Sequence, residues 1–437
     1  MRRRAPLRLT ALAALCLGLS ACGGGGSTHH HSQTPPARPH TFRPPSVVDV
    51  YSSLPLRGPL SGEGAAVKAG IELALAAPGE EGPLEVKYTS LDDADSRGWD
   101  QQRTVANAMR VARDPKAVLY VGDLDSAASA SSIPVLNLAG IPQISPGSTY
   151  IGLTQGLPRV PGATEGRLNE PHIYYPSGLR TFLRVIPADN VQAAAAIEAL
   201  QRPLGCTRVA IAYDGSSQYG LSLAALLHAS AHPYGVDVTS LTKIDPTQTN
   251  FHALAEQLRT ENANCLVFAG VVSTASIELV KQIHLASPTM RILGTDGVCS
   301  ARWTNPHLGG VAATDDPFVY CMQPTLPVAE YPGASTFVTL YQELYGRHAE
   351  PSPYALFGYE AMALGLDSIN QLGSGGANRE ALRQTLFATT DRVSGLGTYS
   401  ITATGDTTLR YYGLYRVGAG GDPKFYKVMI PPHVLGP

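Results

Sequence analysis

The 437-residue sequence lacks the features that would mark a nucleic-acid-binding protein, a membrane-spanning protein or a common hydrolase. Its 33 basic and 35 acidic residues nearly balance, so no charge excess would attract a nucleic acid. The apolar run at residues 9–19 is too short to cross a bilayer comfortably, and no other stretch is long and apolar enough to do so. The motifs GxSxG, HExxH and GxxxxGK do not occur, which removes the anchors of nucleophile-elbow, zincin and P-loop sites.

The beginning of the chain predicts export. Three arginines at positions 2–4 precede a short apolar run, which ends in "LSAC" at residues 19–22. A charged start, a run too short to span comfortably and small residues before the cut are typical of a signal peptide. "LSAC" resembles the lipobox of bacterial lipoproteins, which implies cleavage after residue 21 and lipidation of Cys22. An ordinary secretory signal is the alternative, and both place the mature protein outside the cytoplasm.

The next residues, 22–46, predict a disordered tether, because glycine and proline break helix and strand and almost nothing apolar can be buried. His29, His30 and His31 could bind a stray metal ion, but a solvated patch is favoured because no carboxylate or cysteine lies nearby. The acidic run of Asp92, Asp93 and Asp95 lacks the glycine and distal glutamate of a calcium loop. We therefore expect no metal site and no cofactor.

From residue 47 onward, short apolar runs alternate with segments of helical period, which is the pattern of parallel sheets covered by helices. The length allows two domains, and we expect an α/β protein with two doubly wound units. Strands are predicted to start at residues 47, 85, 117 and 141 in the first unit, and at 208, 236, 265, 291 and 318 in the second. Helices are predicted at 333–346, 353–372 and 378–389, followed by a hairpin around Gly405 and Asp406.

Four cysteines remain after Cys16 and Cys22 are assigned to the signal and the lipid anchor. An even number in an oxidising compartment predicts disulfides. If the second unit has strand order 2-1-3-4-5, its first and third strands are neighbours, and so are its fourth and fifth. We therefore predict two bridges, against two other pairings and a zinc site that lacks CxxC spacing: Cys206 with Cys265, and Cys299 with Cys321.

Several segments, taken in order, resemble motifs of the type I periplasmic binding proteins, especially the leucine, isoleucine and valine binders that supply ABC importers. The segments are "RGPLSGEGAAVKAGIELAL" from residue 57, "SLDDAD" from 90, "YVGDLDSAAS" from 120, "ISPGST" from 144, "IAYDGSSQYG" from 211 and "LGTDGV" from 293. The resemblance implies two lobes joined by three hinge strands that close on a small molecule, without catalysis. Lobe 1 would comprise 47–187 plus 322–406, and lobe 2 would comprise 188–321 plus 407–437.

The resemblance also implies ligand contacts at the carboxyl ends of strands, where open α/β sheets bind ligands. Ser126, with backbone amides of the next helix, would hold a ligand carboxylate. Ser148 and Thr149 would contact the carboxylate and ammonium groups, Tyr219 would close over the ligand, and Asp296 would pair with the ammonium. Each has a structural alternative, since Ser126 and Thr149 could cap helices, Tyr219 could be core, and Asp296 a turn residue.

Departures from the family pattern bear on the ligand. Glu63 stands where leucine and isoleucine binders often carry an aromatic residue, and Val271 where they often carry a tyrosine. Glu63 would suit a polar or cationic ligand, unless it turns to solvent. Asp95 and Asp125 replace a disulfide found in some members. Residues 154–180 form a longer connection than usual, which could cover the cleft mouth or run over the surface.

We expect a monomeric, lipid-anchored receptor that delivers an amino acid or a related small molecule to an ABC permease. A sensor of the same fold that reports to a membrane signalling partner is the main alternative. An extracellular enzyme on this scaffold is a third and weaker one.

Overall fold

The computed structural model describes residues 46–77, 82–158, 169–311, 316–418 and 420–436. The predicted signal peptide, the predicted lipidation site Cys22 and residues 22–45 of the predicted tether, with its three histidines, lie outside these residues. Within the described part, no helix combines the length and the apolar character that a bilayer crossing requires.

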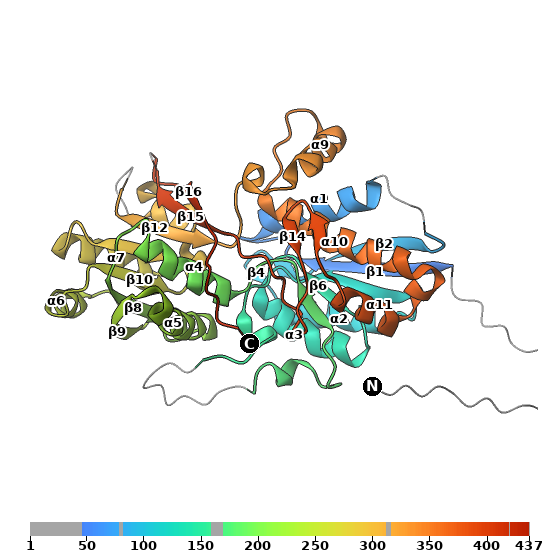
Figure 1. Cartoon of the computed structure of the whole chain (residues 1–437), viewed down its shortest axis with the longest axis horizontal. Helices are drawn as coiled ribbons and strands as arrows, with labels where there is room; N and C mark the ends of the chain where they lie inside the picture. The colour runs from blue at the N-terminus through green and yellow to red at the C-terminus, as the bar shows by residue number, and fades with distance from the viewer. Residues whose placement is uncertain (1–45, 78–81, 159–168, 312–315, 419, 437) are drawn as a thin grey trace, which may run out of the picture. The chain divides into compact units, whose positions relative to one another are not determined.

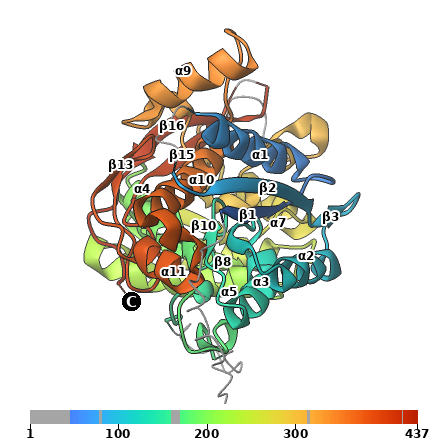
Figure 2. The same cartoon turned by 90° about the vertical axis from the view of Figure 1, so that its right-hand side faces the viewer.

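The first sheet consists of five parallel strands in the order β2-β1-β5-β6-β7. These strands are β1 (Val47–Leu54), β2 (Glu85–Asp92), β5 (Ala117–Gly122), β6 (Gln143–Ser145) and β7 (Phe182–Arg184). One face packs on α1 (Ser61–Ala76), α10 (Pro353–Leu372) and α11 (Arg379–Phe387). The other face packs on α2 (Gln101–Arg113) and α3 (Ser126–Leu138), so helices cover the sheet from both sides (Figure 2). Coverage on both sides explains why β5 is buried along its whole length.

The contact between α1 and α10 is unusually close, because glycines lie where the two helices meet. A Cβ atom on Gly70 would lie 1.8 Å from the Ala355 carbonyl oxygen, and one on Gly358 would lie 2.2 Å from the Val67 carbonyl oxygen. Only glycine permits this backbone-to-backbone approach. It joins two segments that are far apart in the sequence, as Figure 1 shows.

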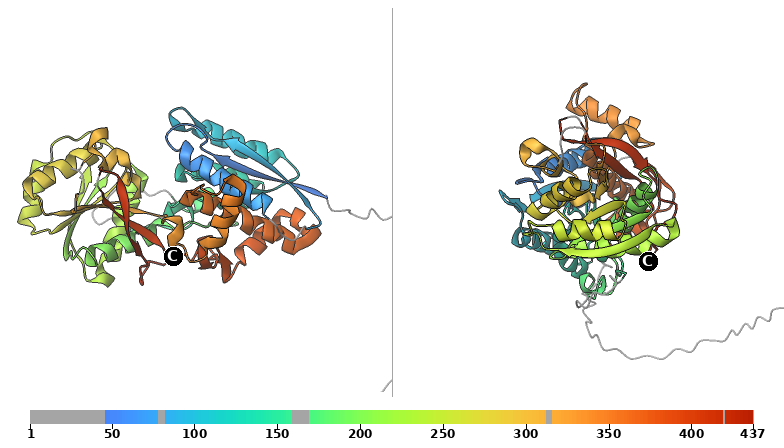
Figure 3. Two further views of the ribbon diagram at one scale, coloured as in Figure 1. Left: turned by 90° about the horizontal axis from the view of Figure 1, so that it is seen from above. Right: turned by 90° about the vertical axis from the view of Figure 1, so that its left-hand side faces the viewer.

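The second sheet has seven strands in the order β16-β15-β12-β11-β10-β8-β9. Its five parallel strands are β8 (Arg208–Asp214), β9 (Asp237–Ile244), β10 (Cys265–Ala269), β11 (Arg291–Gly294) and β12 (Val319–Gln323), and β15 (Tyr412–Val417) and β16 (Pro423–Met429) add antiparallel strands. One face packs on α4 (Asp189–Gln201) and α5 (Gln218–Ala231). The other packs on α6 (His252–Thr260), α7 (Thr274–Ala286) and α8 (Ala301–Thr304). Figure 3 shows this sheet between its helices. Two doubly wound α/β units, as predicted from the sequence, are confirmed.

The remaining elements are the helix α9 (Ala334–Tyr345), which packs on the core of the first sheet, and several short pieces. The short strands are β3 (Ala94–Asp95), β4 (Gly98–Trp99), β13 (Arg392–Ser394) and β14 (Gly397–Tyr399). The 3-10 turns are η1 (Ile151–Leu153), η2 (His172–Tyr174), η3 (His232–Tyr234), η4 (Asp296–Val298), η5 (Pro306–Leu308), η6 (Val328–Glu330) and η7 (Gly373–Ala377).

Both predicted disulfides are confirmed. Cys206 is bonded to Cys265 with a Cα–Cα distance of 5.9 Å, and Cys299 is bonded to Cys321 with a Cα–Cα distance of 5.3 Å. The reason is the predicted strand order, since β8 pairs with β10 and β11 pairs with β12.

The hairpin predicted around Gly405 and Asp406 is present as a short antiparallel turn, but its flanks do not extend into two paired strands. The flanks meet in a bridge between Ile401 and Thr407 and in backbone hydrogen bonds from Thr402 to Asp406 and from Thr408 to Ser400. β14 pairs with β13 instead, and β15 pairs with β12 and β16. The segment between β14 and β15 folds into a turn because the Asp406 side chain is drawn into a buried ion pair.

Candidate functional site

The predicted ligand residues of the first sheet lie on the loops that follow β5 and β6. Asp125, and not Ser126, is the cap of α3, because its carboxylate accepts the N–H groups of Ala127 and Ala128 at 2.7 and 3.3 Å. The capping alternative for Ser126 is therefore wrong, since Ser126 is the first residue of the helix. Its hydroxyl oxygen accepts the Tyr150 N–H at 3.2 Å, which ties the two loops together.

Ser148 is fully buried, and its hydroxyl is engaged by the protein. It lies 2.8 Å from the Ser129 hydroxyl, and the carbonyl oxygens of Asp123 and Asp125 lie 3.1 and 3.2 Å away as acceptors. These contacts fix the loop after β6 against the loop after β5. The side chain therefore holds the loops in place, and any ligand contact at this position falls to the neighbouring backbone.

Thr149 lies at the junction with α4. Its carbonyl oxygen accepts the Asp189 N–H at 3.0 Å. Its hydroxyl lies close enough to the Asp189 carboxylate to lower the pKa of that group, against the larger effect of burial. The backbone N–H groups of Ser126 and Thr149 make no hydrogen bond to another residue within the described ranges. Two amides and the Ser126 hydroxyl therefore form a small set of donors suited to an anion.

Tyr219 and Asp296, predicted from separate motifs, are brought together at the ends of β8 and β11. The Tyr219 hydroxyl donates to Asp296 Oδ1, lies 3.1 Å from Thr295 Oγ1 and accepts the Gly297 N–H at 3.0 Å. Burial raises the pKa of Asp296 above that of an ordinary carboxyl, although the hydrogen bond from Tyr219 acts in the opposite direction. The carboxylate of Asp296, a half-buried residue, is thus held by the hydroxyl of a tyrosine.

Three further buried side chains belong to this cluster and were not predicted: Asp189, Gln192 and Tyr412. Both carboxylate oxygens of Asp189, both amide atoms of Gln192 and the Tyr412 hydroxyl lack a well-formed hydrogen bond among the described residues. Burial raises the pKa of Asp189, and the negative charge of Asp296 raises it further. Unpartnered polar groups in a protein interior are uncommon, and such a concentration points to a missing partner.

Charges of this cluster also act on Tyr354 of α10, and so does the carboxylate of Glu63 in α1. Burial raises the pKa of Tyr354, and the carboxylates of Asp296 and Glu63 raise it further. Glu63 is half-buried in the first turn of α1 and has no hydrogen bond or ion pair within the described residues. Tyr412 likewise has its pKa raised by burial and then by Asp296 and Asp189. The carboxylates of Asp189, Asp296 and Glu63 therefore act on tyrosines of one cluster.

Val271 differs from the other predicted ligand residues. It follows β10 and is 44% exposed. No hydrogen bond or core contact connects it with the cluster of Asp189, Gln192, Tyr219, Asp296 and Tyr412.

A buried ion pair supports the loop that carries Ser148 and Thr149. Arg184 Nε lies 2.7 Å from Asp406 Oδ1, and the Arg184 side chain is fully buried. The same guanidinium donates to the carbonyl oxygens of Ser148 and Tyr150 at 2.9 and 3.0 Å. Burial raises the pKa of Asp406, but Arg184 and three hydrogen-bond donors outweigh it and leave that pKa below the ordinary value.

The described parts of the long 154–180 connection are anchored to the protein. Thr154 Oγ1 and Gln155 Nε2 donate to the Asp406 carboxylate at 2.8 and 2.6 Å. The hydroxyls of Tyr150 and Tyr174 both donate to Glu170 at 2.7 Å. The middle of this connection, 159–168, lies outside the described residues.

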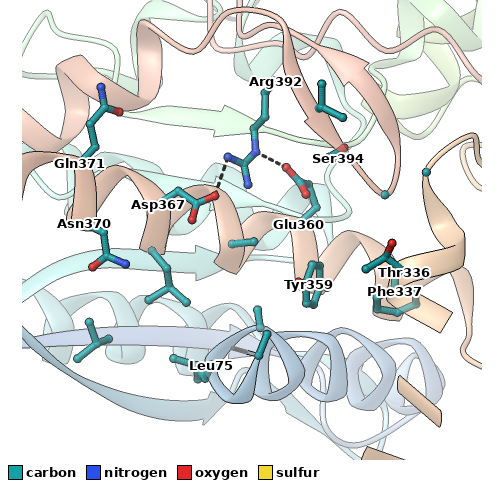
Figure 4. A pocket seen from close by; sticks show the side chains of 18 of the residues that line it. Leu75, Thr336, Phe337, Tyr359, Glu360, Asp367, Asn370, Gln371, Arg392 and Ser394 are labelled. Carbon is teal, nitrogen blue, oxygen red and sulfur yellow. Dashed lines mark hydrogen bonds and ion pairs between the residues drawn. The ribbon is translucent and has the colours of Figure 1, made fainter. Parts of the chain in front are cut away.

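A hollow of about 1230 Å³ lies elsewhere, between α1, α10, β2 and the loop of β13 (Figure 4). None of the predicted ligand residues lines it. Its most prominent charged group, Arg392, is already paired with Glu360 at 2.6 Å and Asp367 at 2.8 Å. Because those charges satisfy one another, the unpartnered cluster at the strand ends is the better candidate for a ligand site.

The described residues contain no group of three or more histidine, cysteine or acidic side chains placed to hold a metal ion. The spacing Ser-x-x-Lys does occur, at 240–243. It lies in the edge strand β9, however, and the Ser240 hydroxyl donates to Glu261 at 2.7 Å. A serine–lysine enzyme needs a serine whose hydroxyl is free to act as the nucleophile. The Ser240 hydroxyl is already bonded to Glu261, so this stretch is structural.

Two doubly wound units with an unpartnered polar cluster at their strand ends define a solute-binding protein of the type I periplasmic fold. The family of periplasmic binding proteins matches residues 53–422, and the chain belongs to it. Members of this family bind solutes outside the cytoplasm and are not enzymes.

Individual relatives are distant. The chain is 24% identical to the Leu/Ile/Val-binding protein BraC3 of Rhizobium johnstonii over 382 residues, which cover 87% of this chain and 94% of the relative. It is 28% identical to an amino acid binding protein of Pseudomonas aeruginosa over 214 residues, which cover 49% of this chain and 50% of the relative. Among solved structures, a leucine binding protein LivK of Thermotoga maritima has a TM-score of 0.65 at 23% identity, covering 88% of this chain and 99% of that one. A substrate-binding protein of Rhodopseudomonas palustris in complex with benzoate has a TM-score of 0.62 at 15% identity, covering 88% and 97%. The same fold thus holds chemically different ligands.

Proposed function

We propose that the protein captures an amino acid or a related small molecule and delivers it to an ABC importer. The observation that carries the proposal is the unpartnered pair of Asp189 and Gln192, with the Asp296 carboxylate acting on Asp189, beside the free amides of Ser126 and Thr149. An α-amino acid supplies the partners that the carboxylates and the amides lack, because its ammonium needs carboxylates and its carboxylate needs N–H donors. The relatives named for leucine, isoleucine and valine support an amino acid as the class.

Capture works by closure of two lobes, 47–187 plus 322–406 and 188–321 plus 407–437, about three connecting strands. The packing supports this division, since the core around α1 and α10 draws mainly on the first set of residues and the cores of the second sheet draw mainly on the second set. Ligand that contacts both lobes would shift the population toward the closed form, which the permease then recognises.

The mature protein is a monomer that is lipidated at Cys22 and held at the outer side of the cell membrane by a tether of residues 22–46. Support comes from the lipobox-like "LSAC" and from the extracytoplasmic setting of the family. A sensor that reports to a membrane signalling partner uses the same trap. A permease and an ATPase encoded beside this chain would favour import, and a kinase there would favour sensing.

The test is a thermal-shift screen of amino acids, amides, small carboxylates and aromatic acids, followed by calorimetry on the hits. We expect at least one amine-bearing compound to raise the melting temperature, and Asp296→Asn to weaken its binding about tenfold or more, because a buried ammonium loses a charged partner. Asp391→Asn, which makes the same charge change on an exposed loop, is the matched control and should bind like the parent.

A screen in which nothing stabilises the protein would overturn the receptor function. If a ligand is found but Asp296→Asn binds it as tightly as the parent, the ammonium contact at Asp296 is wrong.

A further inference from the structure

The backbone of the loop after β6 is almost completely hydrogen-bonded, and the Thr149 N–H is the exception. The N–H groups of Ser148 and Tyr150 donate to the hydroxyl oxygens of Ser145 and Ser126, at 2.9 and 3.2 Å. The carbonyl oxygens of Ser148, Thr149 and Tyr150 all accept hydrogen bonds. The Thr149 N–H has no partner among the described residues, although Thr149 is only 6% exposed. A buried N–H without a partner is rare, so we expect its acceptor to be a ligand.

The two loops that carry the donors of Ser126 and Thr149 have no positive charge of their own. Residues 122–132 and 145–157 include Asp123 and Asp125 but no lysine, arginine or histidine. Backbone amides supply only partial positive charges. A ligand carboxylate held by these amides therefore needs a full positive charge from another element.

Arg184 of β7 brings such a charge to the loop from within the protein. Its Nη1 donates to the Ser148 carbonyl oxygen at 2.9 Å and to the Tyr150 carbonyl oxygen at 3.0 Å, one residue on either side of Thr149. Its Nε is paired with Asp406 at 2.7 Å. Because the Arg184 side chain is fully buried, water does not screen the positive end that meets the loop.

The peptide unit between Ser148 and Thr149 connects this charge with the unpartnered N–H. In a trans peptide the carbonyl oxygen and the amide hydrogen point in opposite directions, so the Thr149 N–H is turned away from Arg184. A hydrogen bond from a guanidinium to the carbonyl polarises the peptide and makes its N–H a stronger donor. Arg184 therefore acts on the acceptor of the Thr149 N–H without touching it.

We propose that Arg184 is a positioning residue of the ligand site, which holds and polarises the Ser148–Thr149 peptide so that the Thr149 N–H selects a carboxylate over an uncharged amide. This inference rests on the proposed solute-binding function and deepens it, because it assigns the preference for a carboxylate to one buried side chain. It also accounts for an anion site beside two aspartates with no basic residue in contact.

Pairs of acids and their primary amides measure this preference, because the two members differ only at the carboxyl group. The pairs are leucine with leucinamide, lysine with lysinamide and benzoate with benzamide, and any other carboxylate from the wider screen is paired with its own amide. In calorimetric titrations of the parent, each acid that binds should bind at least about tenfold more tightly than its amide. The double variant Arg184→Leu with Asp406→Leu removes the ion pair without leaving a buried charge, and it should reduce this ratio to within about threefold.

Two further variants separate the charge of Arg184 from a merely structural role. Asp406→Asn breaks the same ion pair but keeps the guanidinium, so the acid-to-amide ratio should stay at the parent value or rise. Arg392→Leu with Glu360→Leu is the matched control, because it removes an ion pair of 2.6 Å that borders the hollow, which no predicted ligand residue lines. This control should leave the ratio at the parent value.

Three results would overturn the inference while leaving the receptor function intact: an amide that binds the parent as tightly as its acid, an unchanged ratio in the double variant, or a fall of the ratio in Asp406→Asn. Binding only of compounds without a carboxylate would have the same meaning. If no compound in the wider screen stabilises the protein, the receptor function fails and the inference fails with it.

Discussion

The five parallel strands of each sheet follow the same order, 2-1-3-4-5, yet the two sheets are cross-linked by different chemistry. In the second sheet, disulfides join the neighbouring strand pairs β8–β10 and β11–β12. The first sheet has no disulfide among the described residues and relies on buried polar ties, of which Arg184–Asp406 is the strongest. The comparison shows that one topology tolerates both solutions, and that the buried ion pair lies where it holds the loop of the candidate site.

The first sheet also has two buried carboxyl groups, Asp93 after β2 and Asp123 after β5. Asp123 accepts hydrogen bonds from Tyr120 at 2.7 Å and Ser132 at 2.5 Å, and its carbonyl oxygen accepts the Ser145 hydroxyl at 2.7 Å. Asp93 is 1% exposed, and its Oδ1 has no partner among the described residues. Burial raises the pKa of Asp93 to about 8 and that of Asp123 to about 7.

The largest expected effect comes from breaking the buried ion pair on one side only. Asp406→Ala should lower the free energy of unfolding by about 3–5 kcal/mol, because Arg184 is left charged and buried without its counter-ion. Urea denaturation followed by circular dichroism measures the loss. The double variant Arg184→Leu with Asp406→Leu should recover a large part of it. A loss below about 1 kcal/mol in the single variant would show that the pair contributes no more than a surface ion pair.

The disulfide between Cys206 and Cys265 closes a separation of 59 residues. Replacing both cysteines by alanine should cost about 4 kcal/mol, because the unfolded chain regains the entropy of that loop. Ligand affinity should hardly change, since this bridge joins the starts of β8 and β10, away from the strand ends that carry Tyr219 and Asp296. A strong loss of affinity in the folded variant would contradict that separation of roles.

The disulfide between Cys299 and Cys321 spans only 22 residues, so its removal should cost about 3 kcal/mol. Unlike the first, it should also weaken ligand binding, because Cys299 directly follows η4, the turn that begins with Asp296. Calorimetry on the alanine pair, side by side with the first disulfide variant, tests the contrast. Equal ligand affinities in the two variants would contradict the expected difference between the two disulfides.

The last expected effect concerns Asp93 and the pH dependence of stability. Its pKa is higher in the folded than in the unfolded protein, so the folded state holds more protons and its stability decreases as the pH rises from about 4 through about 8. Asp93→Asn removes the contribution of this group, and above pH 8 the variant should melt at a higher temperature than the parent. Near pH 5 the two melting temperatures should converge. A variant that is less stable than the parent at every pH would contradict a neutral Asp93 in the fold.

Strands and disulfides could be predicted because their signals are strong. Strands β5 and β10 are continuous apolar runs, and β8 is apolar between its terminal Arg208 and Asp214, as parallel strands buried on both faces require. The three-residue strands β7 and β13 are too short to show a period. The turn at Gly405 and Asp406 was predicted, but not the partners of the strands around it, because strand propensity does not reveal partners, and β15 pairs with β16 and β12.

The site was predictable only in part. Ser126, Thr149, Tyr219 and Asp296 stand at strand ends within motifs that resemble the family, so position and chemistry agree. Asp189 and Gln192 lie at the start of an alanine-rich helix that reads as plain core. Their spacing of three places them on one helix face, and that spacing was the available signal.

The glycine crossing of α1 and α10 has a consequence for how the protein is made. The first half of the chain can form its sheet, but the apolar face that α10 covers stays open until residue 372 has been synthesised. Because non-local contacts form late, the early part of the chain must be kept from aggregating while the rest emerges. The backbone contact that completes the first unit therefore cannot form before most of the chain has been synthesised.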